Sequence, residues 1–297
     1  LHLHYGVRCK NRSLEIAASA HGRQSVDYAG YIGRNGLMRS VNVLESTILH
    51  GSDQIFWLDG SSAESVSDMR RVNGQIRTEI TEKPSDLHIR EGAGKTVLWR
   101  HSVDSFVAGK PTGSEKGFAT SGTYTFAGVV HDPKGQFLPR TFSLIVGDAP
   151  PTGHAIVLYP SPVSVRFNSA GGLRMTLARD ADDSALPWAI VTVTVTIPGL
   201  GSQTYRGQTD QHGDLLLPFL RLPPLPEGVS DYSATLEVVG RLDTDSEVPA
   251  DPDTFSPLDV GELNSTSFSQ TIGFSVVPGD ILTLRSDGRS FLALKPV

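Results

Sequence analysis

The segment that decides the fold is the run Ile190-Val-Thr-Val-Thr-Val-Thr-Ile197, in which apolar residues alternate with threonine. Two further runs follow, Tyr205-Arg-Gly-Gln-Thr209 before the turn Asp210-Gln-His-Gly213, and Tyr232-Ser-Ala-Thr-Leu-Glu-Val-Val239. A period of two residues buries one face of a strand and leaves the other in water, which is typical of a sheet and not of a helix. Residues 173–240 therefore predict one β-sandwich module.

This module resembles the carboxypeptidase regulatory-like family, a β-sandwich of the transthyretin or CNA-B type. The residues that carry the resemblance are Pro187 before the first strand, the alternating run 191–195, the turn Thr209-Asp210-Gln211-His212-Gly213, and the apolar run 215–220 before Pro223-Pro224. The side chain of Asp210 is expected to cap its turn, and Gly213 to supply a positive φ. Modules of this family are usually non-catalytic, which is what the resemblance implies here.

Composition restricts the function classes. The chain has 297 residues, 38% of them hydrophobic and 20% charged, with 30 Gly and 19 Pro, as many short strands joined by turns require. Its formal net charge of −6 argues against nucleic acid as a main partner. The single cysteine, Cys9, excludes an internal disulfide framework, and no partner constellation makes it a catalytic thiol. No apolar run of transmembrane length and no signal-peptide core is seen.

The fold class expected is mainly β, with few or short helices and two β-rich domains. Residues 1–147 are expected to form an N-terminal domain that ends in a hairpin over residues 123–146, and residues 148–154 a Gly- and Pro-rich linker. Residues 155–297 are expected to form the regulatory-like antiparallel β-sandwich, with a long acidic loop over residues 240–263. The three-residue spacing of apolar side chains within residues 61–77 predicts one short helix.

The hairpin over residues 123–146 is signalled by its turn. Asp132-Pro133-Lys134-Gly135 places proline at the second turn position and glycine at the fourth. The run from Phe126 to Phe142, with residues 154–162 and 187–189, is similar to accessory proteins of phage-tail-like contractile injection systems. In that setting regulatory-like sandwiches are structural parts beside sheath, tube and baseplate, and this is what the resemblance implies.

Acidic clusters are the first candidates for a binding site. Asp180, Asp182 and Asp183 offer oxygen ligands in a loop and are candidates for calcium, although a solvated acidic loop is the simpler interpretation. Four acidic residues of the long loop are candidates for contact with a basic neighbour: Asp243, Asp245, Asp251 and Asp253. Replacing Asp251 and Asp253 by alanine is expected to weaken incorporation into an assembly and to leave the fold intact.

Motifs for phosphate binding, zinc binding and nucleophilic catalysis are incomplete or absent in the sequence. Gly94-Lys95-Thr96 lacks the earlier glycine of a phosphate-binding loop, since Ile89 stands there, and is interpreted as a tight turn. The nine histidines are scattered without zinc-ligand spacing, and no Gly-x-Ser-x-Gly is present. Aromatic residues could form a sugar-stacking surface, although Trp57 and Trp188 are more simply core residues; the set is Trp57, Trp99, Trp188, Tyr28, Tyr31 and Tyr205.

The sequence favours a non-enzymatic structural or assembly component of a multi-protein particle, with a phage-tail-like contractile injection system as the particle. Its partners would be other subunits, including copies of itself, and it would be assembled in the bacterial cytoplasm and then stay with the particle or be released. No catalytic residue, cofactor or metal is assigned, and neither nucleic acid nor a membrane span is expected. Two alternatives stay open: a carbohydrate- or cell-surface-binding module, and a hydrolase with a dispersed site.

Overall fold

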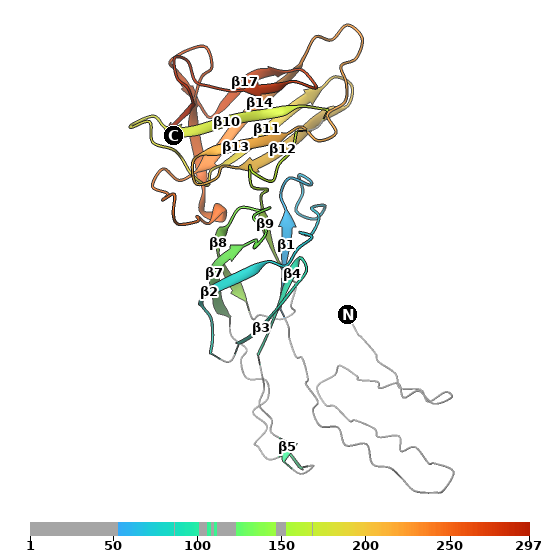
Figure 1. The fold of residues 1–297 in the computed structure, drawn as a ribbon, viewed down its shortest axis with the longest axis vertical. Coiled ribbons are helices and arrows are strands. Elements are labelled where there is room, and N and C mark those ends of the chain that lie inside the picture. The colour runs from blue at the N-terminus through green and yellow to red at the C-terminus, as the bar shows by residue number, and fades with distance from the viewer. Residues whose placement is uncertain are drawn as a thin grey trace, which may run out of the picture. The chain divides into compact units, whose positions relative to one another are not determined.

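The computed structural model describes residues 53–85, 87–100, 106–107, 110–111, 123–146, 153–167 and 169–297, all of which belong to one compact unit from Leu49 to Val297. The regular secondary structure of the described residues is almost entirely β, which confirms the predicted mainly β fold class (Figure 1). Residues 1–52 of the predicted N-terminal domain, with Cys9, Tyr28 and Tyr31, lie outside the described residues, and so do residues 148–152 of the predicted linker.

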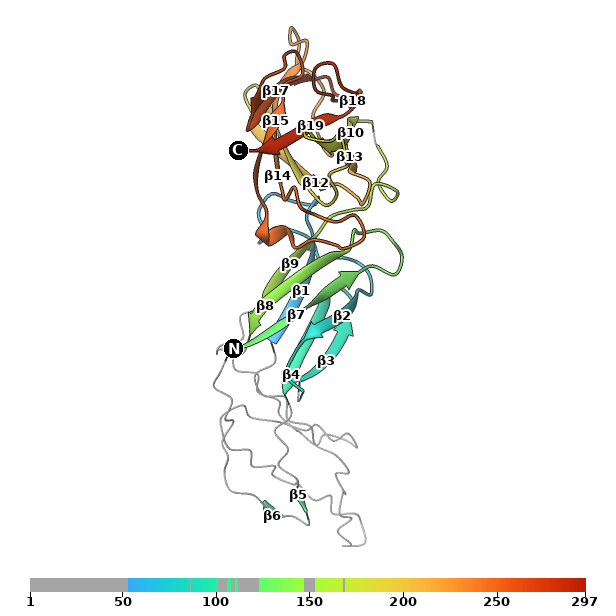
Figure 2. The same cartoon turned by 90° about the vertical axis from the view of Figure 1, so that its left-hand side faces the viewer.

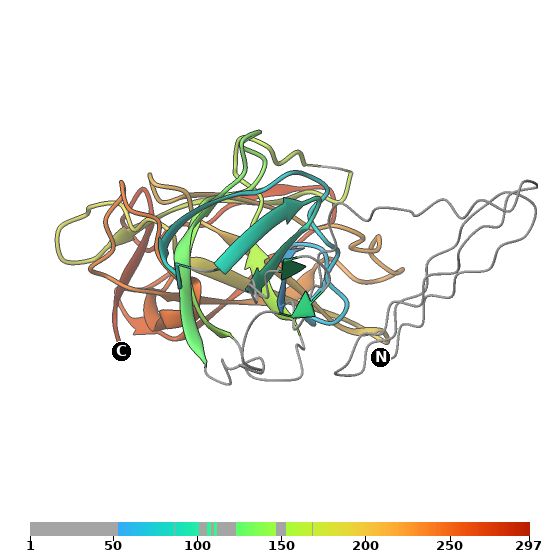
Figure 3. The same cartoon turned by 90° about the horizontal axis from the view of Figure 1, so that it is seen from below.

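The first part of this unit contains two small sheets around one core. One sheet has the order β3-β4-β1-β9, formed by β1 (Asp53–Asp59), β3 (Leu87–Gly92), β4 (Lys95–Arg100) and β9 (His154–Leu158). The other has the order β2-β7-β8, formed by β2 (Arg77–Glu82), β7 (Tyr124–His131) and β8 (Arg140–Val146), and Figure 3 shows it from below. A separate two-stranded sheet is formed by two strands of two residues each, β5 (Phe106–Val107) and β6 (Lys110–Pro111).

Aromatic packing builds the core between these two sheets. Trp57 is fully buried, with its ring 5.8 Å from that of Phe142, which in turn lies 5.5 Å from Phe126. The indole nitrogen of Trp57 donates to Thr96 Oγ1 at 3.0 Å, so the buried polar group has a partner. Trp57 is thus a core residue, as the sequence predicts.

The predicted helix over residues 61–77 is wrong, because the segment is a series of turns returning to β1. The amide of Val72 donates to the carbonyl of Trp57, and Ser62 Oγ accepts from the amide of Arg70. Serine side chains that bond to nearby backbone groups compete with helix hydrogen bonds. Of the spaced apolar residues, Met69 and Val72 are buried, whereas Val66 is exposed.

The boundary between the two β-rich parts lies later than the predicted linker. Strand β9, which begins at His154, pairs in parallel with β1, with Ile55 opposite His154 and Asp59 opposite Leu158. The strand that follows the predicted linker therefore completes the first sheet instead of opening the second domain. Ile156 and Leu158 are buried in the core of the first part.

The second part is a ten-stranded sheet that wraps around one core and gives two layers (Figures 1 and 2). Its main path is β12-β11-β14-β15-β19-β10-β13, and β16, β17 and β18 join at its side. The strands are β10 (Gly172–Arg179), β11 (Ile190–Ile197), β12 (Gly201–Gln208), β13 (Asp214–Pro218), β14 (Tyr232–Gly240), β15 (Ser256–Gly261), β16 (Phe268–Ser269), β17 (Thr271–Val276), β18 (Ile281–Thr283) and β19 (Leu292–Pro296).

The alternation predicted for this part is present in the structure. In β11 the residues Val191, Val193 and Val195 are fully buried, and the threonines between them are more exposed. Two expectations need correction. The sheet is mixed and not wholly antiparallel, because β10 pairs in parallel with β18 and β19. The acidic segment is also shorter than predicted, because β15 and the short 3-10 helix η1 (Pro252–Thr254) lie within residues 240–263.

Candidate functional site

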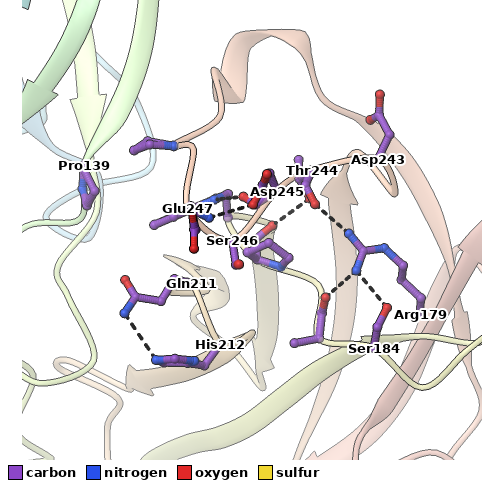
Figure 4. A pocket seen from close by; sticks show the side chains of 14 residues that line it. Pro139, Arg179, Ser184, Gln211, His212, Asp243, Thr244, Asp245, Ser246 and Glu247 are labelled. Carbon is purple, nitrogen blue, oxygen red and sulfur yellow. Dashed lines mark hydrogen bonds between the residues drawn. The ribbon is translucent and has the colours of Figure 1, made fainter.

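The acidic segment over residues 241–253 is the most distinctive surface feature of the second part. Arg179, at the end of β10, fixes its first half with two hydrogen bonds, from Nε to the carbonyl of Leu242 at 2.5 Å and from Nη2 to that of Thr244 at 2.8 Å. The same guanidinium donates to Ser184 Oγ and to the carbonyl of Ala185 (Figure 4). A charged donor with four acceptors holds the loop backbone in one conformation.

Trp188 provides the second anchor. Its indole nitrogen donates to the carbonyl of Asp245 at 2.8 Å, and its own carbonyl accepts from the buried amide of Gln208 at 2.8 Å. Its φ of 66° is uncommon for so bulky a residue, and the surrounding contacts keep it there. Trp188 is 98% buried and belongs to the protein interior, as the sequence predicts.

Arg140, the first residue of β8, holds the second half of the segment. Its Nη2 donates to Asp251 Oδ1 at 2.6 Å and to Asp253 Oδ2 at 2.8 Å, and its Nη1 donates to the carbonyl of Val157 at 3.1 Å. The Arg140 side chain is only 2% exposed. The adjacent Thr141 donates its amide to Ala250 and its hydroxyl to the carbonyl of Pro249.

These contacts change the expectation for Asp251 and Asp253. Both carboxylates serve as counter-charges of a buried arginine of the same chain. Alanine at both positions would leave that charge without an ionic partner, which is costly in a protein interior. The prediction that this double substitution leaves the fold intact therefore has to be withdrawn, and a test of partner binding needs other residues.

A wide cleft of about 1070 Å³ lies along the acidic segment. One wall is the loop with Asp245, Ser246 and Glu247, the other is the turn with Gln211 and His212, and Pro139 lies at one end (Figure 4). The three loop residues are exposed, and so are Gln211 and His212. The cleft is therefore an open surface of mixed polar and apolar character, with carboxylates on one side.

The charges on this loop differ in their partners. Arg241 bonds to Asp243 through two nitrogens, at 3.0 and 2.6 Å, and this hydrogen bonding together with the arginine charge lowers the pKa of the Asp243 carboxyl below its ordinary value. Asp245 Oδ1 accepts from the backbone amide of Glu247 at 2.9 Å. In the described part of the chain, no basic side chain forms a salt bridge with Asp245 or Glu247. These two carboxylates can therefore accept hydrogen bonds from a cationic ligand.

The three calcium candidates have partners within the chain. Asp180 accepts from Arg289 at 2.7 Å, and Asp183 accepts from the same guanidinium. Asp182 caps its own turn through Ser184, whose hydrogen bonds lower the pKa of the Asp182 carboxyl. Among the described residues, no group of three or more His, Cys, Asp or Glu side chains is arranged to hold a metal ion.

The aromatic residues do not form an exposed platform in the described part of the chain. Trp57, Trp188 and Tyr205 are buried, and the exposed large hydrophobic side chains of that part are all aliphatic. The side chain of Trp99 lies outside the description. The specific observation that a sugar-binding surface requires, two aromatic faces on one side, is thus missing from these residues.

The contacts of two described histidines, His131 and His212, do not form a catalytic arrangement. His131 Nε2 lies 3.3 Å from Glu79 Oε1, and His212 Nε2 lies 3.2 Å from Gln211 Nε2. Neither of these two contacts involves a serine hydroxyl. Gly94 has a φ of 64° in the two-residue turn between β3 and β4, so this segment is a tight turn as predicted.

Both predicted Asp-x-x-Gly turns are present. Asp132 Oδ1 accepts from the amide of Lys134, and Gly135, with a φ of 65°, closes the turn after Pro133. Asp210 Oδ1 accepts from the amides of His212 and Asp214, and Gly213 has a φ of 76°. A Cβ at Gly213 would lie 2.5 Å from the carbonyl oxygen of Leu177, whereas one at Gly135 would meet nothing within 4 Å.

Sequence reasoning missed the three arginines that organise these loops, Arg140, Arg179 and Arg289. The sequence did contain an indication for Arg140. It lies two residues before Phe142 in β8, so both side chains point to the same face of the strand, and both are buried. An arginine in the apolar phase of a strand indicates a buried charge that needs partners. Nothing in the sequence says where those partners lie.

The comparisons with known proteins give little to add to this geometry. No family model matches the chain, and no curated protein matches it. Among solved structures, the chain is similar to the Bacillus anthracis TIE protein, at 15% sequence identity and a TM-score of 0.21. The match covers 78% of this chain and 32% of that one, so this chain spans about a third of its neighbour's length.

One further finding concerns membranes. Within the described residues there is no helix with the length and apolar character that a membrane crossing requires.

Proposed function

We propose that this protein is a non-enzymatic structural or assembly component of a multi-protein particle, which acts through protein–protein interfaces. The observation that carries the proposal is the rigid acidic loop beside the cleft. Arg179, Trp188 and Arg140 each bind its backbone or its carboxylates, so the exposed groups are presented in one arrangement. A preorganised surface loses little conformational entropy on binding.

The charge of this surface defines the kind of partner. Asp245 and Glu247 lie on the rim of the cleft, and the whole chain has a net charge of −6. A neighbouring subunit that offers a lysine or arginine side chain to the cleft would satisfy both carboxylates. Enzymatic chemistry has no comparable support, because His131 lies beside Glu79 and His212 beside Gln211, and neither contact involves a serine hydroxyl.

For the particle itself, the proposal rests on the similarity of residues 126–142, 154–162 and 187–189 to accessory proteins of contractile injection systems. In such a particle the protein would be assembled in the bacterial cytoplasm beside sheath, tube and baseplate subunits. The turn over residues 132–135 and the Trp188 anchor, both within these segments, shape the structure but do not identify the assembly.

The test is the mass of the purified chain, alone and co-expressed with the products of its neighbouring genes. A stable co-complex is expected. The variant Glu247→Lys reverses a charge on the rim and should release the partner, whereas the matched variant Glu227→Lys, in an exposed loop outside the cleft, should not. A chain that never associates with any neighbour would overturn the structural role, and a complex indifferent to Glu247→Lys would move the contact away from the cleft.

A further inference from the structure

Strand β17 (Thr271–Val276) ends one side of its sheet. It pairs with β14 along its whole length, from Glu237 opposite Thr271 to Tyr232 opposite Val276. On its other side no described strand pairs with it, and it lies at the border of the sheet in both views (Figures 1 and 2). The outer edge of β17 is therefore available to a further strand.

The direction of the free backbone groups follows from Thr271. The amide of Thr271 donates to Ser269 Oγ at 3.4 Å, and its carbonyl accepts from the same hydroxyl at 2.9 Å, so these groups point away from β14. Every second residue of an antiparallel strand directs its amide and carbonyl to the same side. Gly273 and Ser275 therefore direct theirs outward, and outside the ladder with β14 no backbone hydrogen bond of the described chain involves them.

The sequence of this edge lacks the usual protection. Residues 264–277 contain no charged residue and no proline, in a chain of which 20% is charged. By contrast, edge strand β2 contains Arg77, Glu79 and Glu82 and a register shift, and edge strand β3 contains His88, Arg90 and Glu91. Charges and bulges are how proteins keep sheet edges from pairing with other chains, and β17 has neither.

We propose that the free edge of β17 pairs with β17 of a second copy of this chain, antiparallel and related by a two-fold axis. This inference deepens the proposed function by naming one partner. Only the role of the dimer in a particle rests on the proposed function, and the pairing itself does not. An uncharged edge complements another uncharged edge, and no described residue on it favours a charged partner. An isologous contact of this kind closes as a dimer.

The free groups fix the register. If Phe274 lies opposite its own copy, Gly273 lies opposite Ser275 of the partner, and the outward amides and carbonyls of both residues are satisfied. On the core side Phe274 meets Phe274, and Ile272 meets Val276, both of which are favourable cross-strand pairs. Phe274 is only half-buried in one copy, and Gly273 has open space above it. The ten-stranded sheet then continues across the two-fold axis into the second copy.

The first test uses two substitutions at one position. Gly273→Pro removes the outward amide without removing a hydrogen bond to β14, and its ring obstructs an incoming strand. Gly273→Ala keeps the amide, and its methyl group has open space. In a concentration series by light scattering, the wild type and Gly273→Ala should dimerise alike. Gly273→Pro should raise the dissociation constant at least about tenfold, which corresponds to about 1.4 kcal/mol. Equal unfolding temperatures for all three chains, measured at a concentration at which each is monomeric, confirm that folding is not the cause.

The second test examines the register by oxidation. With Cys9→Ser as background, Phe274→Cys should form a disulfide-linked dimer, because directly opposite residues bring their Cβ atoms within about 5 Å. Ser202→Cys, exposed on edge strand β12, should not. A wild type that stays monomeric at every concentration, or a Gly273→Pro chain that dimerises as tightly as the wild type, would overturn the pairing. Equal cross-linking at both cysteines would overturn the register. These measurements use the chain alone, so their failure leaves the co-complex test of the proposed function unaffected.

Discussion

Two arginines of this protein each bind two aspartates, and they differ in how far they are removed from water. Arg140 bridges Asp251 and Asp253 with its side chain 2% exposed, whereas Arg289 bridges Asp180 and Asp183 with its side chain 33% exposed. The residue types and the number of ionic partners are the same. What differs is the free-energy cost of a guanidinium without ionic partners. This cost is large for a buried side chain and small for one that water can hydrate.

This difference separates two roles that the sequence does not distinguish. All of these aspartates lie in acidic, loop-like stretches, and by sequence alone all are candidates for binding a partner or ion outside the chain. The structure assigns Asp251 and Asp253 to an internal site that joins the loop to β8. The contact of Arg289 with Asp180 and Asp183 lies nearer the surface, contributes little to the free energy of folding, and can be lost without unfolding the protein.

The largest effect is expected from removing both counter-charges of Arg140. The double substitution Asp251→Ala with Asp253→Ala should lower the free energy of unfolding by about 3–5 kcal/mol, because a buried charge loses its ionic partners. Urea unfolding of the purified variant measures the change. A loss below about 1 kcal/mol would show that water reaches Arg140 and would remove the contrast between the two sites.

A smaller effect is expected when the charge itself is replaced. Arg140→Met keeps the length of the side chain and should cost about 1–3 kcal/mol, because the carbonyls of Val157 and Thr141 lose their charged donor. In the background of the double aspartate variant, the same substitution should restore stability instead of lowering it further. A double-mutant cycle on unfolding free energies gives the sign, and additive losses would contradict a charge-based origin.

At the exposed site the corresponding loss should be slight. The double substitution Asp180→Ala with Asp183→Ala should change the unfolding free energy by about 0–1 kcal/mol, since Arg289 can be hydrated. Raising the salt concentration should shrink this difference further, because exposed charges are screened. Unfolding curves at low and high salt check both statements, and a loss as large as that at Arg140 would mean that exposure does not govern the two sites.

The smallest effect is expected at the pair of Arg241 and Asp243, whose side chains are more than half exposed on average. The folded-state pKa of Asp243 is lowered by Arg241, so the pair stabilises the fold above the unfolded pKa of about 4 and loses this contribution as the pH falls through the folded value. An NMR titration should show the Asp243 carboxyl below its ordinary value of 3.8, and Arg241→Ala should return it there. An Asp243 midpoint that Arg241→Ala does not move would assign the shift to another group.

Local sequence patterns predicted several strands and turns of the fold correctly. The alternation over residues 190–197 predicted β11 and its buried face, and the two Asp-x-x-Gly turns were predicted with their capping aspartates and their glycines of positive φ. Both features depend on interactions between residues a few positions apart, so they can be predicted from the sequence. The same reasoning failed over residues 61–77, where the hydroxyl of Ser62 bonds to two backbone groups in place of a helical turn.

By itself the sequence determined that this protein is built from strands and turns, because side-chain period and turn chemistry are local properties. Only the tertiary structure decided that β9 pairs with β1, that Arg140 meets Asp251 across 111 positions of chain, and that β17 ends a sheet without a partner. Such contacts depend on how distant segments pack, and the energy of a buried charge or a free edge is set by its surroundings. No local pattern records those surroundings, which is why the internal site and the open edge became visible only in the folded chain.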